Sequence, residues 1–401
     1  MASTSTAGSG PVSDVVVIGG GISGVAAAYE LARHGVGVTL LERGDLASMA
    51  SGWTLAGVRQ SGRHPAELPL ARAAVTRWSD LSANLGADVE YRQEGNLRLA
   101  RNADEVGTIQ AIVAEQRTLG LDLSFLLDNA AVREVAPAIA ASVLAASFCP
   151  SDGHANPTAT VRAFAGAAAR HGATICPNTA VSAIEVHGGR VIGVRAGDGR
   201  RFGADAVVVT AGVYTGDLLA PLGLDLPLRL AQVPVVQTVP VPPLLAQVLG
   251  VATADFAGRQ QADGRFRVTG GGAPWPFGLG DLAGGNDLVQ PTAQQIQTTI
   301  ARGIEVLPAL AEARVARVWG GLLDMTPDAL PVIELVPEVA GLVVAAGFSG
   351  HGFCLGPITG QIARELVLDG RSSLPIEPFR RARFDGRGVT PDRAAAATLH
   401  G

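Results

Sequence analysis

Hydrophobic positions near the start of the chain change their spacing twice. Val15–Ile18 is a short run of β-branched residues, which is typical of a buried strand. From Ile22 to Ala32 the apolar side chains recur at helical spacing, and Gly35 marks the end of that helix. A second apolar run covers 36–41. The pattern predicts a strand, a helix and a strand, the unit of a nucleotide-binding fold of about 30 residues.

The rest of the chain alternates between helical spacing and short apolar runs. Helices are predicted over 63–85, 103–119 and 357–368, with Pro357 at the start of the last and Gly370 after its end. Turns rich in glycine join three predicted strands over 181–186, 190–195 and 201–209, which indicates a β-meander that feeds a buried strand. Leu342–Ala346 is one more short apolar strand.

Longer alternating runs with many prolines cover 226–272 and include strands over 233–241 and 265–268. This pattern of alternating apolar positions and prolines predicts a separate antiparallel sheet. The fold class is therefore α/β, with a Rossmann-like domain and an α+β domain built on the antiparallel sheet.

A chain of 401 residues is too long for one ordinary core, so two domains are expected. We expect a discontinuous cofactor-binding domain over 14–82, 150–217 and 318–372. The substrate domain is expected over 83–149 and 218–317. The segments 1–12 and 387–401 are expected to be flexible tails.

Composition narrows the class of protein. Hydrophobic residues make up 47% of the chain and charged residues 17%, which excludes a disordered chain. A net charge of −5 gives no basic surface for nucleic acid. Cys149, Cys176 and Cys354 lie far apart, and the histidines share no metal-ligand spacing, so neither a disulfide nor a metal is expected. The first basic residue is Arg33 and no apolar run has membrane length, so we expect a cytoplasmic protein without an integral membrane segment.

Gly19, Gly21 and Gly24 form a GxGxxG motif between the first strand and the first helix. The first glycine permits a tight turn, the second lets backbone approach a diphosphate, and the third lets the helix pack close to the strand. The helix N-terminus supplies N–H groups and partial positive charge to phosphate. Glu42 follows about 20 residues later, where a carboxylate accepts the ribose hydroxyls of a dinucleotide. The motif therefore predicts dinucleotide binding.

Further motifs follow along the chain, and their order and spacing are informative together. They are Ala50-Ser51-Gly52, Gly57-Val58-Arg59, 207–212, Trp319-Gly320-Gly321, 326–331 and 347–353. With the glycine motif they resemble the D-amino-acid-oxidase-like family of FAD-dependent oxidoreductases, which includes glycine oxidase, sarcosine oxidase and D-amino-acid dehydrogenase. The resemblance runs from about Asp14 to Gly370. The segments 57–60 and 69–71 are most similar to the branch of sarcosine oxidase β, opine oxidase and proline dehydrogenase.

The resemblance implies that FAD is the cofactor and gives each motif a place along it. Ser51 and Gly52 are expected at the diphosphate or the flavin edge, and Val181 at the adenine. The loop 347–353 is expected to bind the ribityl chain and the pyrimidine side of the flavin through its N–H groups. The expected cofactor-binding residues are Gly19, Gly21, Ile22, Ser23, Gly24, Glu42, Arg43, Ser51, Gly52, Gly57, Val181, Ala211, Gly212, Gly347, Phe348, Ser349, Gly350, His351, Gly352 and Phe353.

The chain departs from the family where a substrate carboxylate is bound. Glycine-oxidase-like enzymes carry an arginine where this chain has Leu323, and monomeric sarcosine oxidases carry a lysine where it has Cys354. Both residues are expected in the substrate pocket. Either the substrate lacks a free carboxylate, or another arginine binds it. The candidates are Arg59, Arg63, Arg229 and Arg267, with Arg59 first.

Two side chains are candidates for a catalytic role. His351 is expected either beside the isoalloxazine ring, where it tunes the flavin or moves a proton, or as a loop histidine held by packing. Arg59 is expected to contact the substrate or to be part of a surface ion pair. The chain contains no lysine, so all 31 basic residues are arginine and a lysine beside the flavin is excluded.

The resemblance implies oxidation of the C–N bond of an amine or amino acid to an imine by hydride transfer to flavin N5. The electron acceptor is oxygen, a quinone or a partner subunit, and the missing lysine favours an acceptor other than oxygen. Two alternatives stay open. A nicotinamide-dependent dehydrogenase explains the glycine motif but not the loop 347–353, and a non-catalytic FAD-bearing subunit explains the missing substrate anchors.

Overall fold

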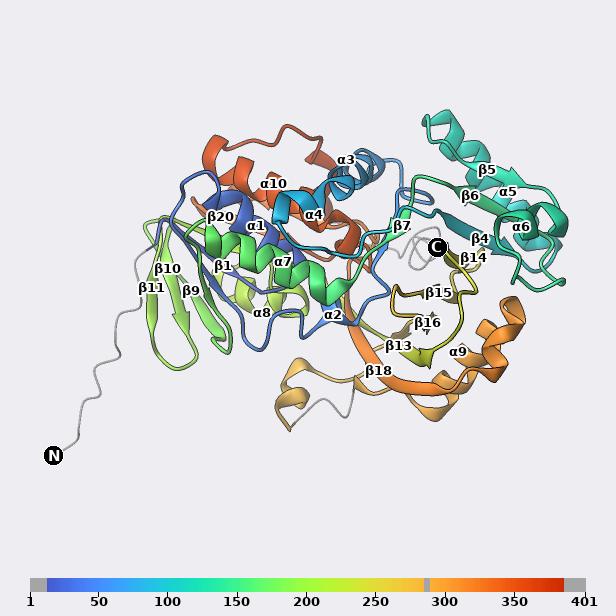
Figure 1. The fold of residues 1–401 in the computed structure, drawn as a ribbon. Coiled ribbons are helices and arrows are strands. Elements are labelled where there is room, and N and C mark those ends of the chain that lie inside the picture. Colours follow the sequence, from blue (N-terminus) through green and yellow to red (C-terminus); the bar gives the residue numbers. More distant parts are fainter. Residues whose placement is uncertain (1–12, 285–288, 386–401) are drawn as a thin grey trace.

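The first of two large sheets is mostly parallel (Figure 1). The computed structural model of the chain describes residues 13–284 and 289–385, so the expected tails 1–12 and 387–401 lie outside the described residues. Six strands occur in the order β19-β20-β12-β1-β2-β8, and β19 alone runs antiparallel to its neighbour. They are β1 (Val15–Ile18), β2 (Val38–Leu41), β8 (Thr174–Cys176), β12 (Ala206–Val209), β19 (Val332–Leu335) and β20 (Leu342–Ala346).

Side chains that alternate along these strands build a three-layer domain. Val15 and Val17 face the core beneath three helices, α1 (Ile22–Ala32), α7 (Pro157–Arg170) and α10 (Gly352–Asp369). Val16 and Ile18 face a three-stranded meander on the other side, which has the strands β9 (Val181–His187), β10 (Arg190–Ala196) and β11 (Arg201–Gly203). Because both faces are covered, the central strands β1 and β12 and their neighbour β20 are apolar throughout.

Several predicted boundaries were wrong. The helix predicted over 357–368 begins at Gly352 and contains Pro357, although proline cannot donate the helical hydrogen bond. The helix predicted over 63–85 is two helices, α3 (Leu68–Ser79) and α4 (Leu81–Leu85), and the strand predicted over 36–41 begins at Val38. The helix predicted over 103–119 is confirmed as α5 (Ala103–Thr118).

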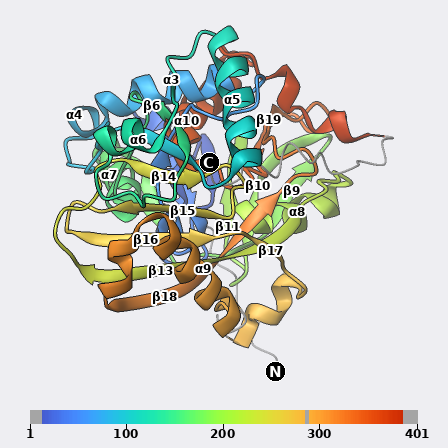
Figure 2. The ribbon, with the colours of Figure 1, turned by 90° about the vertical axis from the view of Figure 1, so that its right-hand side faces the viewer.

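The second sheet has nine strands and curves away from the first (Figures 1 and 2). Its neighbours are antiparallel except for β14 and β4. The strands are β4 (Asn96–Ala100), β5 (Ser124–Leu126), β6 (Ala145–Cys149), β13 (Arg229–Pro240), β14 (Val248–Val251), β15 (Phe256–Gln260), β16 (Arg265–Gly270), β17 (Ala273–Pro274) and β18 (Val315–Met325). Because β18 pairs with β13, the domain boundary expected at 318 falls inside a strand of this sheet.

Helices and short strands cover and connect the two sheets. α9 (Ala293–Val306) packs on β13, β15 and β16, and α5 packs on β4 and β6 (Figure 2). The remaining α-helices and strands of the described residues are α2 (Ala50–Trp53), β3 (Gly57–Val58), α6 (Asn129–Val135), β7 (Gly153–His154) and α8 (Thr215–Leu219). Within the described ranges, no helix is long and apolar enough to cross a membrane. The predicted fold class, a Rossmann-like domain joined to a domain built on a largely antiparallel sheet, is confirmed.

Candidate cofactor and substrate site

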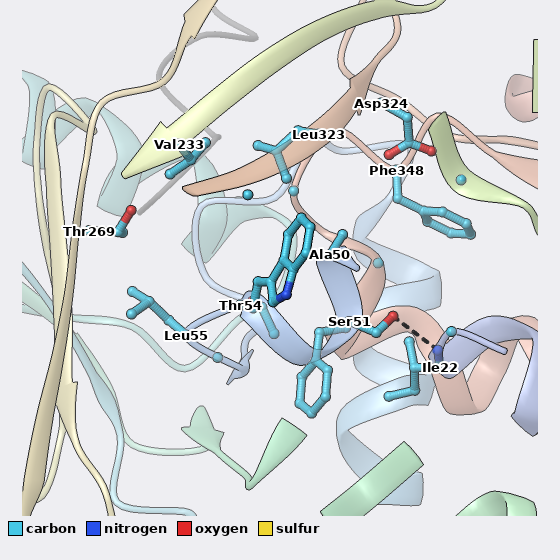
Figure 3. Close-up of a pocket in the computed structure, with 18 of the residues that line it drawn as sticks. Ile22, Ala50, Ser51, Thr54, Leu55, Val233, Thr269, Leu323, Asp324 and Phe348 are labelled. Carbon is cyan, nitrogen blue, oxygen red and sulfur yellow. Dashed lines mark hydrogen bonds between the residues drawn. The ribbon is translucent and has the colours of Figure 1, made fainter. Parts of the chain in front are cut away.

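Two connected cavities lie where the two sheets meet. The glycine chamber has a volume of about 300 Å³ and is lined by Gly19, Glu42 and Val181. The sheet chamber has a volume of about 200 Å³ and is lined by Arg63, Val233 and Leu323 (Figure 3). The two chambers share seven residues, which are Gly21, Ala50, Ser51, Thr210, Gly212, Leu322 and Asp324. A long ligand can therefore extend from one chamber into the other.

The three glycines of the GxGxxG motif each meet a different steric demand. Gly19 has φ +109°, a conformation that favours glycine. A Cβ at Gly24 would lie 1.9 Å from the carbonyl oxygen of Gly19, so only glycine lets α1 pack this close to the loop. Gly21 caps α1 without a side chain and lines both chambers. Beside it the Ile22 N–H donates to Ser51 Oγ at 3.0 Å, the dashed line in Figure 3. The helix N-terminus thus faces the space that an anion would occupy.

Polar and aromatic groups surround the glycine chamber. The two carboxylate oxygens of Glu42 accept hydrogen bonds from the Gly20 N–H at 2.6 Å and the Gly44 N–H at 2.8 Å. The Arg43 guanidinium lies 3.8 Å from the centre of the Tyr214 ring. Val181, Ala211 and Gly212 complete the wall. A carboxylate, a cation stacked on a ring and exposed backbone suit a nucleotide.

These features fit a dinucleotide cofactor. Gly21 offers no side chain at the point shared by both chambers, so a diphosphate can approach the N-terminus of α1. Glu42 would hold the ribose on one side. The loop residues Phe348, Gly350, Gly352 and Phe353 line the sheet chamber on the other side, where a flavin ring would lie.

The sheet chamber has an apolar wall and a cationic end. The wall includes Val233, Val235, Val248, Ala257 and Leu323. In Figure 3, Val233, Thr269 and Leu55 lie across the space from Asp324 and Phe348. The cationic end is made by Arg59 and Arg63, and the neutral amide of Asn96 also lines the chamber; all three residues are buried. Such a chamber suits a ligand with one anionic group and an apolar remainder.

Arg63 is the cation with unused donor capacity. Its Nε donates to the Arg59 carbonyl at 3.3 Å and lies 3.8 Å from a carboxylate oxygen of Glu67. Its Nη1 is buried and has no hydrogen-bond partner among the described residues. Arg59 differs, because its Nη1 donates to the Ser61 carbonyl at 2.7 Å. Leaving a buried charged donor unpaired costs free energy, so Arg63 is prepared for an anionic ligand.

Two side chains that are distant in the sequence, those of Asp152 and Cys354, hold the backbone of the segment that carries Arg59 and Arg63. The Asp152 carboxylate accepts hydrogen bonds from the backbone N–H groups of Gln60 at 2.8 Å and Ser61 at 3.2 Å. The Cys354 thiol meets the backbone N–H and the carbonyl of Arg59 at 3.3 Å each. Burial lowers the pKa of Arg59, and the neighbouring Arg63 and Arg98 charges act in the same direction. The fold therefore concentrates positive charge at this end of the chamber.

His351 lies where the second of its two expected places put it, as a loop histidine held by buried contacts, whereas Cys354 does not line the expected substrate pocket. Neither is among the residues that line the two chambers. The Nδ1 atom of His351 lies 2.9 Å from a carboxylate oxygen of Glu67, just before α3. Burial lowers the pKa of His351 and Arg63 acts in the same direction, so a neutral imidazole donates this hydrogen bond. The contact ties the loop 347–353 to α3, and Cys354 supports Arg59.

Some of the other expected residues line a chamber, and others do not. Ile22, Ser23, Ser51, Gly57, Arg59, Arg63 and Leu323 line the sheet chamber, and Arg43 lines the glycine chamber. The expected cofactor-binding residues among them that line neither chamber are Gly24, Gly52, Gly347 and Ser349. Arg229 is exposed at the start of β13. Arg267 donates to the Thr54 carbonyl at 2.6 Å and stacks on Trp319, so it supports the wall from behind.

Four polar residues that none of the sequence motifs singled out line the chambers or bond to the residues beside them. They are Glu67, Asn96, Asp152 and Asp324, and all are buried. A sequence signal existed for two of them. Glu67 and Asp324 each interrupt an apolar run, and a carboxylate at a buried position requires a partner or a function.

Comparisons with known proteins agree with this geometry. The model of the DAO family, described as FAD dependent oxidoreductase, matches residues 14–366. Glycine oxidase of Geobacillus kaustophilus is 27% identical over 383 residues, which cover 93% of this chain and 98% of that protein. Sarcosine oxidase subunit beta of Arthrobacter sp. is 28% identical, with 96% and 95% covered.

A solved structure is also similar to this chain in both fold and sequence. L-proline dehydrogenase from P. horikoshii superposes with a TM-score of 0.84 at 27% identity, covering 93% of this chain and 98% of that one. The family match includes the glycine motif, both chambers and the loop 347–353. The chain therefore belongs to the DAO family of FAD-dependent oxidoreductases, and FAD is its cofactor.

Proposed function

We propose that this enzyme oxidises the C–N bond of an amino or imino acid that carries an apolar substituent, and that Arg63 binds the substrate carboxylate. The observation that carries the proposal is the buried Nη1 of Arg63 at the wall of the sheet chamber, for which the described parts of the chain offer no hydrogen-bond partner. The relatives support this class, since glycine oxidase, sarcosine oxidase and L-proline dehydrogenase are named for amino acids.

The side chains of the chamber account for binding and orientation. Arg63 and Asn96 hold the carboxylate at the cationic end, while Val233 and Leu323 contact the substituent and exclude water. The charges of Arg59 and Arg63 disfavour an ammonium, so the neutral amine, which is the oxidisable form, is favoured. FAD, when bound, accepts the hydride that leaves the α-carbon as the imine forms.

Kinetics on matched substrates test the role of Arg63. Arg63→Met should lower kcat/KM for proline by about ten- to a hundred-fold, since a charge-assisted hydrogen bond is worth about 1.5–3 kcal/mol. Turnover of pyrrolidine, the same ring without the carboxylate, should change little. Other cyclic or N-alkyl amino acids, each paired with its decarboxylated analogue, extend the test if proline itself is not oxidised.

A parallel variant separates the two arginines. Arg59→Met should affect both substrate classes equally, because Arg59 Nη1 already bonds the Ser61 carbonyl. A selective loss on carboxylates in Arg59→Met but not in Arg63→Met would transfer the role to Arg59. Rapid oxidation of glycine by the unmodified enzyme would contradict the requirement for an apolar substituent.

For the electron acceptor we propose a quinone or a partner subunit in preference to oxygen. The chain has no lysine to place beside the flavin. The sarcosine oxidase relative, which matches this chain over nearly the whole length of both proteins, is named as a beta subunit. Its name therefore makes that relative one part of an assembly. Enzyme reduced by substrate without air should react slowly with oxygen and rapidly with a soluble quinone. Rapid reoxidation by air would identify an oxidase, and a flavin that no amine reduces would favour the non-catalytic alternative.

A further inference from the structure

Asp324 is a buried carboxylate that the proposed substrate chemistry does not use. It lies near the end of β18 and lines both the glycine chamber and the sheet chamber. The residue is 7% exposed. In Figure 3 it lies beside Phe348 at the edge of the sheet chamber, on the opposite side from Val233 and Thr269. Asp324 therefore lies where the two chambers join, a region that we call the passage.

The contacts of Asp324 reach the loop 347–353. Its Oδ2 accepts a hydrogen bond from the Gly347 N–H at 2.7 Å, and its backbone carbonyl accepts one from the Ser349 N–H at 3.1 Å. A carboxylate can accept about four hydrogen bonds, so acceptor capacity remains toward the chambers. Burial raises the pKa of Asp324 to about 6, and the backbone N–H groups of Gly347 and Phe348 act in the opposite direction. The other charged residues that line the chambers are Glu42, Arg43, Arg59, Arg63 and Asp217.

The order of the chemical groups in FAD indicates which of them would lie in this passage. With the diphosphate at the N-terminus of α1 and the flavin ring in the sheet chamber, the ribityl chain must cross the passage. Its three hydroxyl groups are donors that would lose their water on entry, and a buried hydroxyl requires a new partner. We propose that the Asp324 carboxylate binds FAD directly, by accepting a hydrogen bond from a ribityl hydroxyl, while it holds the loop 347–353 in place.

The proposal implies a dependence of FAD binding on pH. A hydroxyl donor favours the ionised carboxylate, so FAD should bind more tightly as Asp324 loses its proton. The dissociation constant of FAD should therefore fall as pH rises from 5 to 7. Above this range Asp324 is ionised in the free protein as well, and its contribution becomes constant.

The experiment measures FAD binding to the apoprotein by quenching of flavin fluorescence. Asp324→Asn keeps the shape but loses the charge, and it should raise the dissociation constant at pH 8 by about tenfold or more. At pH 5, below the raised pKa of Asp324, the carboxylate of the unmodified protein carries less charge, so the loss should be smaller than at pH 8. Asp328→Asn is the matched control, because Asp328 lies four residues away, is bound to Arg383 and is outside both chambers.

A cofactor analogue assigns the contact to the ribityl chain. FAD with a deoxy-ribityl chain should bind the unmodified protein more weakly than FAD does, and it should bind Asp324→Asn with little further loss. Circular dichroism and thermal unfolding of the apoproteins establish that each variant is folded, and Asp324→Ser repeats the test if the asparagine variant is not. Unchanged FAD binding in a folded variant at pH 8, or additive losses with the analogue, would overturn the proposal. The test uses cofactor binding alone, so its outcome is independent of the substrate proposal.

Discussion

Adding one methyl group in the glycine motif, either at Gly21 or at Gly24, should separate the requirements of cofactor binding from those of folding. Gly21 has an extended backbone, φ −76° and ψ 177°, which any residue adopts. A Cβ there would lie 3.0 Å from Ser51 Oγ, the end of a side chain that can move. Gly21→Ala should therefore cost the apoprotein no more than about 1 kcal/mol. The new methyl group would nevertheless stand where the diphosphate approaches backbone, and losing one charge-assisted hydrogen bond there should weaken FAD binding about ten- to a hundred-fold.

Gly24→Ala should behave differently. Its Cβ would lie 1.9 Å from the Gly19 carbonyl oxygen and 2.6 Å from Thr210 Oγ1. Non-bonded heavy atoms attract one another at about 3.5 Å or more, so α1 would have to move by over 1 Å. Overpacking of this kind costs about 1–3 kcal/mol or more. This variant should lose both stability and FAD.

The assay compares three apoproteins, the unmodified one and the two variants, for thermal unfolding and for FAD affinity. The expected result is a nearly normal melting temperature with weak FAD binding for Gly21→Ala, and losses in both for Gly24→Ala. The assignment of the diphosphate to the N-terminus of α1 would be refuted by a folded Gly21→Ala, or the bulkier Gly21→Val, that retains full FAD occupancy and an unchanged dissociation constant.

Four further outcomes are expected. Denaturation should release the yellow colour as free FAD, since no attachment motif is evident in the sequence, and colour that stays with the protein would indicate a covalent bond. Glu42→Ala should weaken FAD binding by tenfold or more, measured by fluorescence titration, because the ribose acceptor and its contacts with two N–H groups are lost. Burial lowers the pKa of His154 to about 3, with Arg259 adding to the effect, so the unfolded chain takes up a proton below about pH 6.5 that the folded protein does not. Stability should fall from pH 6.5 toward pH 3 by up to about 1.4 kcal/mol per unit in urea melts, and His154→Gln should flatten that slope. Gly360→Val should lower the melting temperature sharply, because a Cβ there lies 2.6 Å from the backbone of Ala26, and a normal melt would contradict the tight packing of α10 on α1.

The parts of the site that sequence could predict are local in the chain. Gly19, Gly21, Gly24 and Glu42 lie within 24 residues, and each has a steric or chemical reason that needs no distant contact. Their strand-helix-strand setting follows from spacing alone, and the structure confirms it. The resemblance supplied the cofactor and the loop 347–353, of which four residues line the sheet chamber.

The parts that sequence could not predict depend on distant contacts. His351 meets Glu67 across 284 positions, and Cys354 meets Arg59 across 295. Nothing in the spacing of these residues indicates that they form these pairs. The start of α10 was also misplaced for a nonlocal reason. Its residues Gly356 and Gly360 pack against α1, and this contact outweighs the local preference of Pro357 for a helix start.

The order of strands in the six-stranded sheet has a consequence for how the protein folds. β1 lies between β2 and β12, with Val15 opposite Ala206, and β12 in turn pairs with β20, where Val207 lies opposite Leu342. During synthesis β1 and β2 therefore leave the ribosome long before their later neighbours exist, and their apolar faces stay uncovered. Closing such long loops is slow, and an open strand edge invites aggregation. Because the loop 347–353 is made after the other segments that line the two chambers, FAD cannot stabilise earlier intermediates, and the yield of folded enzyme should depend on growth temperature and chaperones more than on flavin supply.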